Sequence, residues 1–99
     1  MSSMKAIVTG HSKGLGAAIA ADLMWRGIPV LGISRGQSGE LANKFPDLLT
    51  QVAMDLADTS QLLAWLAGDD LRNYLEGCPL ALLVNNAGTV QPVGPLPDQ

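Results

Sequence analysis

Four short runs of apolar residues divide the chain, and each run is continuous instead of alternating with polar positions. Continuous runs are typical of parallel strands that carry helices on both faces. The runs predict strands at Met4–Val8, Pro29–Ser34, Leu49–Met54 and Leu80–Asn85.

Between these runs the apolar residues recur at three- and four-residue steps, which predicts helices. The first helix is expected from Gly14 to Arg26. Gly27 ends it, because glycine tolerates the left-handed conformation common just past a helix end. The predicted stripe that lies on the sheet comprises Leu15, Ala18, Ile19, Leu23 and Met24.

A second, short helix is expected after a turn at 36–39; it runs through Lys44, and Pro46 terminates it. The third helix opens at Asp58-Thr59, where either side chain can accept a bond from the first unpaired N–H groups. One broad apolar side of this third helix comprises Leu62, Leu63, Leu66, Tyr74 and Leu75.

The third helix is interrupted at 68–70 by a glycine and two aspartates, so a kink or a split is expected there. Gly77 and Pro79 end it. The tail from 91 to 99 is proline-rich without an apolar period and is expected to be a loop.

The alternation of strands and helices predicts a doubly wound (Rossmann-type) α/β fold with a parallel sheet of about four strands and about three helices. Right-handed crossovers give the strand order 3-2-1-4, with the first two helices on one face and the third on the other. The unit spans 1–90 and is truncated, because nothing follows the fourth strand to cover its outer edge. That edge, or the third helix, is expected to mediate homo-oligomerisation.

The amino-acid composition limits the kinds of partner that this chain is expected to bind. The 99 residues carry a net charge of −3, which argues against a nucleic acid. Charged residues are only 15% and hydrophobic ones 47%, which predicts apolar surface that meets another chain or a missing remainder of this one. No segment has the roughly 18 uninterrupted apolar residues of a membrane span. The single cysteine, Cys78, suits a reducing compartment, so a cytoplasmic location is expected.

The junction between the first strand and the first helix holds the main candidate site. Gly10, Gly14 and Gly16 lie there with the spacing G-x-x-x-G-x-G. Residues without side chains let the backbone approach a pyrophosphate, and the following helix directs its free N–H groups at the negative charge. A plain tight turn is the alternative interpretation.

Two further segments lie at predicted strand ends: Asp55-Leu56 after the third strand and Asn85-Asn86-Ala87-Gly88 at the end of the fourth. Together with the glycine loop, they resemble the short-chain dehydrogenase/reductase family in order and separation. The resemblance covers the whole chain but only the N-terminal part of a typical family member.

The resemblance implies roles for individual residues. Gly10, Gly14 and Leu15 would contact the pyrophosphate and adjoining ribose through their backbone atoms. Asp55 would accept a hydrogen bond from the adenine amino group, and the Leu56 N–H would meet the ring. The residues expected beneath the adenosine ribose are Asn86, Ala87 and Gly88. Two alternatives remain open: Asp55 could cap the next helix instead, and Asn85 could tie neighbouring strands or contact the cofactor.

The end of the second strand predicts NADP, with NAD less favoured. An acidic residue there would bond the ribose 2′-hydroxyl and repel a 2′-phosphate, but this chain has Ser34-Arg35. A guanidinium grips phosphate bidentately, and Ser12 and Lys13 would join it in the family's geometry. The alternative is that Lys13 and Arg35 are solvated surface cations.

The only histidine, His11, has no partner at ligand spacing, which argues against a metal site. It is expected to be a loop residue whose ring touches the ribose, without a catalytic role.

The catalytic residues of the family have no match here. Family members use a tyrosine, a lysine four residues later and a serine, but the only tyrosine, Tyr74, precedes Cys78 at that spacing, and no serine follows Ser60. The chain is therefore expected to be an inactive N-terminal part of an NADP-preferring oxidoreductase. The alternative is a stand-alone nucleotide-binding or regulatory module. The sequence does not specify the substrate.

Overall fold

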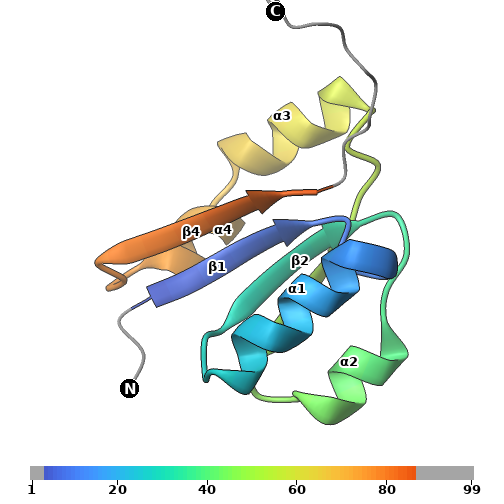
Figure 1. Cartoon of the computed structure of the whole chain (residues 1–99). Coiled ribbons are helices and arrows are strands. Elements are labelled where there is room, and N and C mark those ends of the chain that lie inside the picture. The colour runs from blue at the N-terminus through green and yellow to red at the C-terminus, as the bar shows by residue number, and fades with distance from the viewer. Residues whose placement is uncertain (1–3, 87–99) are drawn as a thin grey trace, which may run out of the picture.

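The structure, a computed structural model, describes residues 4–86 and shows four parallel strands in the order β3-β2-β1-β4 (Figure 1). The elements are β1 (Met4–Thr9), α1 (Gly14–Trp25), β2 (Val30–Ser34), α2 (Gly39–Lys44), β3 (Leu49–Ala53), α3 (Thr59–Ala67), α4 (Asp70–Leu75) and β4 (Leu80–Asn85). The predicted fold class and strand order are confirmed. The predicted 91–99 loop lies outside the described residues.

The helices number four in the described part of the chain, because the third predicted helix is split. Gly68 adopts an extended conformation (φ −81°, ψ −165°) that ends α3, and α4 begins two residues later. Of the two outcomes expected at this interruption, the split is the one observed.

The first two helices cover one face of the sheet and the last two cover the other, as the crossover rule predicts (Figure 1). The core under α1 and α2 is the better packed of the two. Its buried members are Ala6, Val8, Ala20, Met24, Val30, Leu41 and Phe45. This face of the sheet therefore holds more buried hydrophobic residues than the other, whose cluster has Leu31, Ile33 and Met54.

The predicted sheet-facing stripe of α1 is wrong in part. Leu15 is 68% exposed and Ala18 is also exposed, whereas the buried positions are Gly16, Ala20 and Met24. The rotation of the helix follows from its first turn. A Cβ atom at Gly16 would lie 1.9 Å from the carbonyl oxygen of Gly10, so this residue contacts the loop directly and the positions four and eight residues later follow it inward.

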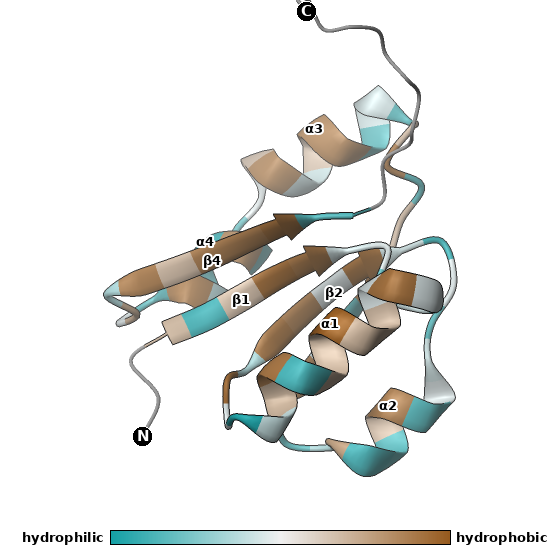
Figure 2. Cartoon of the chain, viewed as in Figure 1, coloured by the Kyte–Doolittle hydropathy of each residue, from teal (hydrophilic) through white to brown (hydrophobic). Residues whose placement is uncertain are grey.

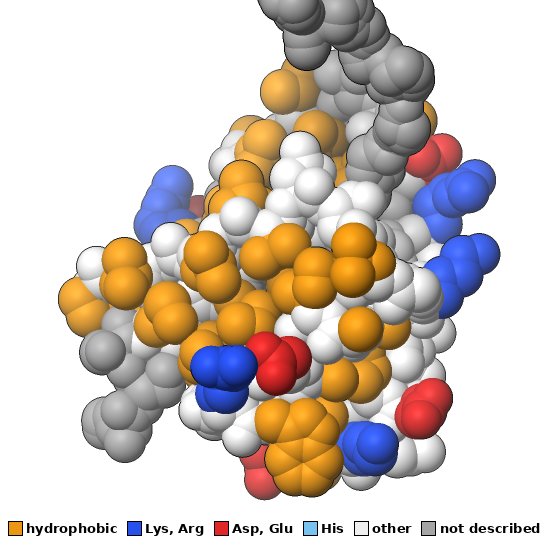
Figure 3. Space-filling model, in the orientation of Figure 1, with side chains coloured by type: hydrophobic (Ala, Val, Ile, Leu, Met, Phe, Trp, Pro, Cys, Tyr) orange, Lys and Arg blue, Asp and Glu red, His pale blue; other side chains and the backbone are white. Residues whose placement is uncertain are grey.

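The second face is more open. Neither α3 nor α4 has a buried residue, and the apolar residues of β4 are largely exposed, with Leu80 at 58% and Leu83 at 65%. Figure 2 shows β4 as a hydrophobic strand at the edge of the sheet. Figure 3 views the other face, on the α1 side, and shows hydrophobic side chains gathered there as well. Apolar surface thus remains exposed around β4, as the composition predicts.

Within residues 4–86, no helix has both the length and the hydropathy that crossing a bilayer requires.

Candidate functional site

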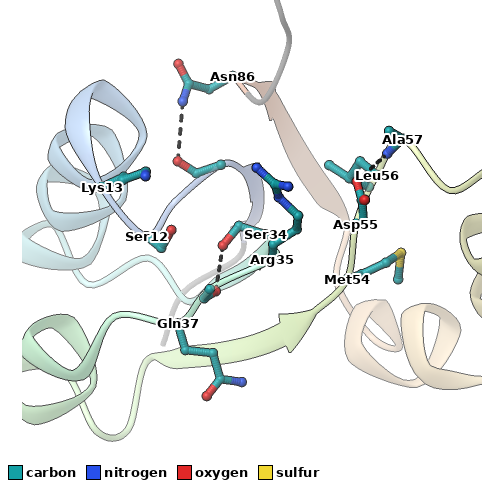
Figure 4. Close-up of a pocket in the computed structure, with 12 residues that line it drawn as sticks. Ser12, Lys13, Ser34, Arg35, Gln37, Met54, Asp55, Leu56, Ala57 and Asn86 are labelled. Atoms are coloured by element: carbon teal, nitrogen blue, oxygen red, sulfur yellow. Dashed lines mark hydrogen bonds between the residues drawn. The ribbon is translucent and has the colours of Figure 1, made fainter.

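An open pocket of about 1010 Å³ lies at the carboxyl ends of the strands (Figure 4). From β1 the sheet extends to β2 and β3 in one direction, and the chain then returns to add β4 on the opposite side of β1. The pocket lies beside this reversal of strand order. Ligands of open α/β sheets bind at such a reversal. The lining residues are Gly10, Ser12, Lys13, Ser34, Arg35, Gly36, Gln37, Met54, Asp55, Leu56, Ala57 and Asn86.

The glycine loop forms one wall of the pocket. Gly10 (φ 71°) and Gly14 (φ 64°) have left-handed backbone conformations that favour glycine. The N-cap residue of α1 is Lys13, whose side chain makes no capping hydrogen bond. The first-turn N–H groups of α1 therefore receive no side-chain cap and remain suited to an anionic ligand.

Two polar side chains hold this loop against β4. Thr9 Oγ1 donates to Asn85 Oδ1 at 3.0 Å and accepts from the Asn86 backbone N–H at 2.8 Å. Asn86 Nδ2 donates to the Gly10 carbonyl oxygen at 3.3 Å. The side chain of Asn85 therefore ties two neighbouring strands, which is one of the two roles left open for it.

The opposite loop, which follows β2, supplies a cation. Arg35 is exposed and lines the pocket together with Lys13 (Figure 4). The ion pairs found among residues 4–86 are Arg26–Asp22 and Arg72–Asp69, so neither pocket cation is neutralised by a described carboxylate. The pocket is therefore suited to an anionic group near these two side chains.

Ser34 has a local partner. Its hydroxyl donates to the Gly36 carbonyl oxygen at 2.6 Å, which shapes the turn that carries Arg35. The two loops also face each other: a Cβ atom at Gly36 would lie 3.8 Å from Ser12 Oγ. The structure thus brings the predicted polar residues of both loops into one pocket.

Asp55 lies at the end of the pocket that follows β3, beside Leu56. Its Oδ1 accepts a hydrogen bond from the Ala57 N–H at 2.9 Å. The cap of α3 is Asp58, which accepts from the Gln61 N–H at 3.1 Å. The alternative role of Asp55 as a helix cap is therefore wrong, and the expected cap at 58–59 is confirmed at Asp58.

Other predicted residues lie apart from the pocket lining. Gly14 and Leu15 form the first turn of α1, beyond the lining residues, and the Leu15 side chain points to solvent. Ala87 and Gly88 lie outside the described residues. Sequence reasoning missed four lining residues, although their positions at or just after the ends of β2 and β3 were a signal: Gly36, Gln37, Met54 and Ala57.

His11 lies in the loop between β1 and α1 as predicted, but the predicted contact of its ring with the ribose is wrong. Its ring is completely buried, with an exposed fraction of 0%, and it does not line the pocket. Nε2 lies 2.6 Å from Oε1 of Gln51 on β3. The ring faces the core because Gly32 on β2 leaves room for it: a Cβ atom at Gly32 would lie 2.3 Å from His11 Cγ.

Tyr74 lies on α4, away from the pocket. Burial, with a smaller contribution from the Cys78 charge, raises the pKa of Tyr74 to about 12. Its ring contacts Lys5, whose Nζ lies 4.9 Å from the ring centroid. Tyr74 is thus not among the residues that line the pocket. Among residues 4–86, no cluster of three or more metal-ligating side chains occurs.

Comparison with family models gives a match to "short chain dehydrogenase" over residues 4–99. Among curated relatives, the very-long-chain 3-oxoacyl-CoA reductase of Lodderomyces elongisporus is 34% identical over 90 residues, which cover 84% of this chain and 24% of the relative. The human dehydrogenase/reductase SDR family member 11 is 33% identical over 94 residues, covering 88% of this chain and 35% of that protein. The chain thus spans only about a quarter to a third of these relatives.

Solved structures give the same family. A short-chain dehydrogenase/reductase from Burkholderia vietnamiensis is 49% identical, with a TM-score of 0.85, over 97% of this chain and 44% of that one. A short-chain dehydrogenase/reductase from Burkholderia multivorans, solved with bound NADP, is 33% identical with a TM-score of 0.67, over 90% of this chain and 38% of that one.

Proposed function

Because this chain belongs to the short-chain dehydrogenase/reductase family, we propose that it is the N-terminal, cofactor-binding part of an oxidoreductase that prefers NADP to NAD. The observation that carries the proposal is a pocket lined by both Lys13 and Arg35, neither of which forms an ion pair with a described carboxylate. The single cysteine, Cys78, favours a reducing compartment, so the cytoplasm is the proposed location.

The glycine loop fits a pyrophosphate. Gly10 and Gly14 expose backbone at left-handed conformations, and the first turn of α1 lacks a side-chain cap. Negative charge is stabilised at such a helix N-terminus by the N–H groups and by the helix dipole. In this proposal Gly10, Gly14 and Leu15 contact the pyrophosphate and its ribose through backbone atoms.

The Arg35 side of the pocket fits a 2′-phosphate. The loop after β2 carries no carboxylate at 34–37, so nothing in it would repel the phosphate or claim the ribose hydroxyl. Arg35 can grip the phosphate bidentately, and Lys13 and Ser12 approach from the facing loop. Ser34 contributes mainly by shaping the turn, since its hydroxyl already donates to Gly36.

The Asp55 side of the pocket fits an adenine. A carboxylate accepts hydrogen bonds from an exocyclic amino group, and the neighbouring Leu56 offers both a backbone N–H and an apolar side chain. Asn86, with Ala87 and Gly88 following it, would lie beneath the ribose. The proposed order along the pocket is therefore adenine at Asp55, 2′-phosphate at Arg35 and pyrophosphate at the glycine loop.

The bound cofactor would donate hydride to a carbonyl in its reduced form or accept hydride from an alcohol in its oxidised form. The residues of this chain bind and orient the adenosine diphosphate half. The proton that must accompany hydride to a carbonyl oxygen needs an acid that this chain does not offer, because Tyr74 lies away from the pocket. The chain on its own is therefore proposed to bind the cofactor weakly and to lack activity.

The proposal is tested by calorimetry with NADP and NAD on the chain and on its Arg35→Asp variant. The chain should bind NADP more tightly than NAD. Arg35→Asp should reverse this order and weaken NADP binding by about tenfold to a hundredfold, since it removes a charged hydrogen bond and adds an anion beside the phosphate.

Lys44→Asp makes the same change of charge on α2, at an exposed lysine outside the pocket lining. It should leave the ratio of NADP to NAD affinity unchanged. Unchanged relative affinities in Arg35→Asp would refute the assignment of the 2′-phosphate to this loop. Failure of the unaltered chain to bind either dinucleotide would refute the whole proposal.

A further inference from the structure

A partly buried hydrogen-bond chain lies behind the pocket and uses none of the residues that line it. His11 Nε2 lies 2.6 Å from Gln51 Oε1, and the same oxygen accepts the Ser38 backbone N–H at 2.8 Å. Gln51 Nε2 donates to the Ser38 carbonyl oxygen at 3.3 Å. We call His11, Gln51 and Ser38 the brace.

The brace joins the two loops that form the phosphate side of the pocket. His11 belongs to the glycine loop, between Gly10 and Ser12, which both line the pocket. Ser38 directly follows Gln37, the last pocket residue of the loop after β2, and it also caps α2 by accepting from the Leu41 N–H at 3.1 Å. A loop that carries Arg35 is thereby anchored at both ends, to β2 and to the brace.

The donor and the acceptor of each hydrogen bond in the brace can be assigned. The Ser38 N–H can only donate and the Ser38 carbonyl can only accept, so the amide of Gln51 is oriented with Oε1 toward the N–H. Oε1 is an acceptor, and His11 must therefore donate to it from Nε2. Nδ1 of His11 is buried and has no hydrogen-bond partner among residues 4–86.

The sequence of β2 makes room for the brace. His11 is 0% exposed, and three atoms of its ring lie within 2.5 Å of the position of a Cβ atom at Gly32. Gly32 is also the register partner of Gln51 in the β2–β3 pairing. The glycine in β2 and the histidine in the loop are thus complementary, and a side chain at Gly32 would displace the ring.

We propose that His11 and Gln51 are positioning residues for cofactor choice: the brace holds the loop at 34–37 where Arg35 reaches a 2′-phosphate. The proposal rests on the proposed preference for NADP. It also gives that preference a physical cause. On an unanchored loop, the long Arg35 side chain and its backbone would lose conformational entropy on binding the phosphate, which weakens binding. The brace restricts the loop before the cofactor binds, so less entropy is lost on binding.

A simple packing role would have different consequences. If His11 only filled space, its removal would lower the stability of the fold and weaken NADP and NAD alike. A brace acts through the loop at 34–37, so its loss should weaken NADP selectively. The ratio of the two affinities therefore distinguishes the two roles.

The test uses Gln51→Met, which keeps the length of the side chain and removes both hydrogen-bonding groups. Affinities for NADP and NAD are measured by calorimetry, and amide hydrogen exchange is measured across 34–41. We expect the NADP-to-NAD affinity ratio to fall about fivefold to tenfold, with faster exchange at Ser38 and Leu41. Thr50→Met, at the exposed neighbouring position on β3, is the matched control and should change neither readout.

His11 provides a rescue experiment. His11→Ala should reproduce the Gln51→Met phenotype, whereas His11→Gln keeps a nitrogen donor at similar reach and should restore most of the ratio. Gly32→Ala should disrupt the brace by its clash with the ring. Combining Gly32→Ala with His11→Ala removes the clash, so the double variant should regain the stability of the fold. It should not regain the NADP-to-NAD affinity ratio, because the brace is still lost.

The outcomes separate this proposal from the proposed function. If the unaltered chain prefers NADP and Gln51→Met keeps that preference, the brace is refuted and the proposed function stands. If the unaltered chain shows no preference, the NADP assignment fails. In that case amide exchange decides whether the brace anchors the loop. Faster exchange confined to 34–41 in Gln51→Met supports the brace as the anchor, and unchanged exchange refutes it.

Discussion

At the scale of single residues, the side chains of this pocket divide into those that face the ligand space and those that hold the facing ones in place. Lys13 and Arg35 face the space without described ion-pair partners. Thr9 acts behind them by fixing the end of β4, and Asn86, which itself lines the pocket, also fixes Gly10. The glycine loop is therefore positioned by hydrogen bonds from the neighbouring strand as well as by its own conformation.

Tyr74 is a residue whose environment can be tested directly, because it is the only tyrosine of the chain. Its hydroxyl is buried without a hydrogen-bond partner among residues 4–86, which disfavours the tyrosinate. We expect titration of the tyrosinate absorbance to give a pKa of about 12 in the folded chain, against the ordinary tyrosine value of 10.0 in denaturant.

The linked effect on stability has a definite sign. Because the folded-state pKa is raised, the contribution of Tyr74 to the free energy of unfolding should be fully present below pH 10.0 and be lost as pH rises toward about 12. Cys78→Ala should lower the midpoint of Tyr74 slightly, since the charge of Cys78 is the smaller cause of the shift. A midpoint near 10 in the folded chain would contradict the burial of this hydroxyl.

At the scale of elements, the position of α1 is set by its first turn more than by its hydrophobic pattern. Gly16 lies against the Gly10 carbonyl, and the small side chains that follow on the same face, such as Ala20, let the helix approach the sheet closely. Leu15, the first residue of the expected stripe, lies on the exposed side as a result.

This contact predicts a large effect of Gly16→Ala. The added Cβ would lie 1.9 Å from the backbone oxygen of Gly10 and 2.6 Å from Asn86 Nδ2, so the loop or the helix must shift. We expect a loss of about 1–3 kcal/mol in the free energy of unfolding, measured with denaturant, together with weaker dinucleotide binding.

The control for Gly16→Ala is Gly39→Ala in α2, where a Cβ atom meets nothing within 4 Å. Alanine there should leave stability unchanged or raise it by about 0.4–1 kcal/mol. If Gly16→Ala were as benign as this control, the close approach of α1 to the glycine loop would be disproved.

At the scale of the whole molecule, the two faces of the sheet are unequally covered. The face under α1 and α2 has a core of seven buried side chains, whereas no residue of α3 or α4 is buried. In the described part of the chain, β4 pairs on one side only, with β1. The apolar surface around β4 is therefore a candidate interface, and we propose that copies of this chain associate through it or through α3.

Light scattering over a concentration series tests this association. The apparent mass should rise with concentration, and Leu83→Lys on β4 should suppress the rise, because Leu83 is 65% exposed at the strand edge. Leu63→Lys tests α3 in the same way. Ala18→Lys, on the exposed side of α1, is the control and should have no effect. A monomer mass at every concentration would contradict the proposal.

The sequence by itself determined the fold class, the strand order and most of the pocket. Apolar runs mark buried strands wherever they occur, and parallel strands must be joined by right-handed crossovers, so these features follow from local patterns and general sterics. The glycine loop, Arg35 and Asp55 could be located because each follows a predicted strand directly. Parallel strands bring such positions to one edge of the sheet.

Only the tertiary structure decided the orientation of individual side chains. His11 was expected at the ribose, but the gap above Gly32 and the amide of Gln51 draw its ring into the core. The helix pattern likewise could not reveal the rotation of α1, because that rotation depends on a contact between Gly16 and Gly10. Both depend on which residues of separate elements become neighbours, and that information exists only once the chain has folded.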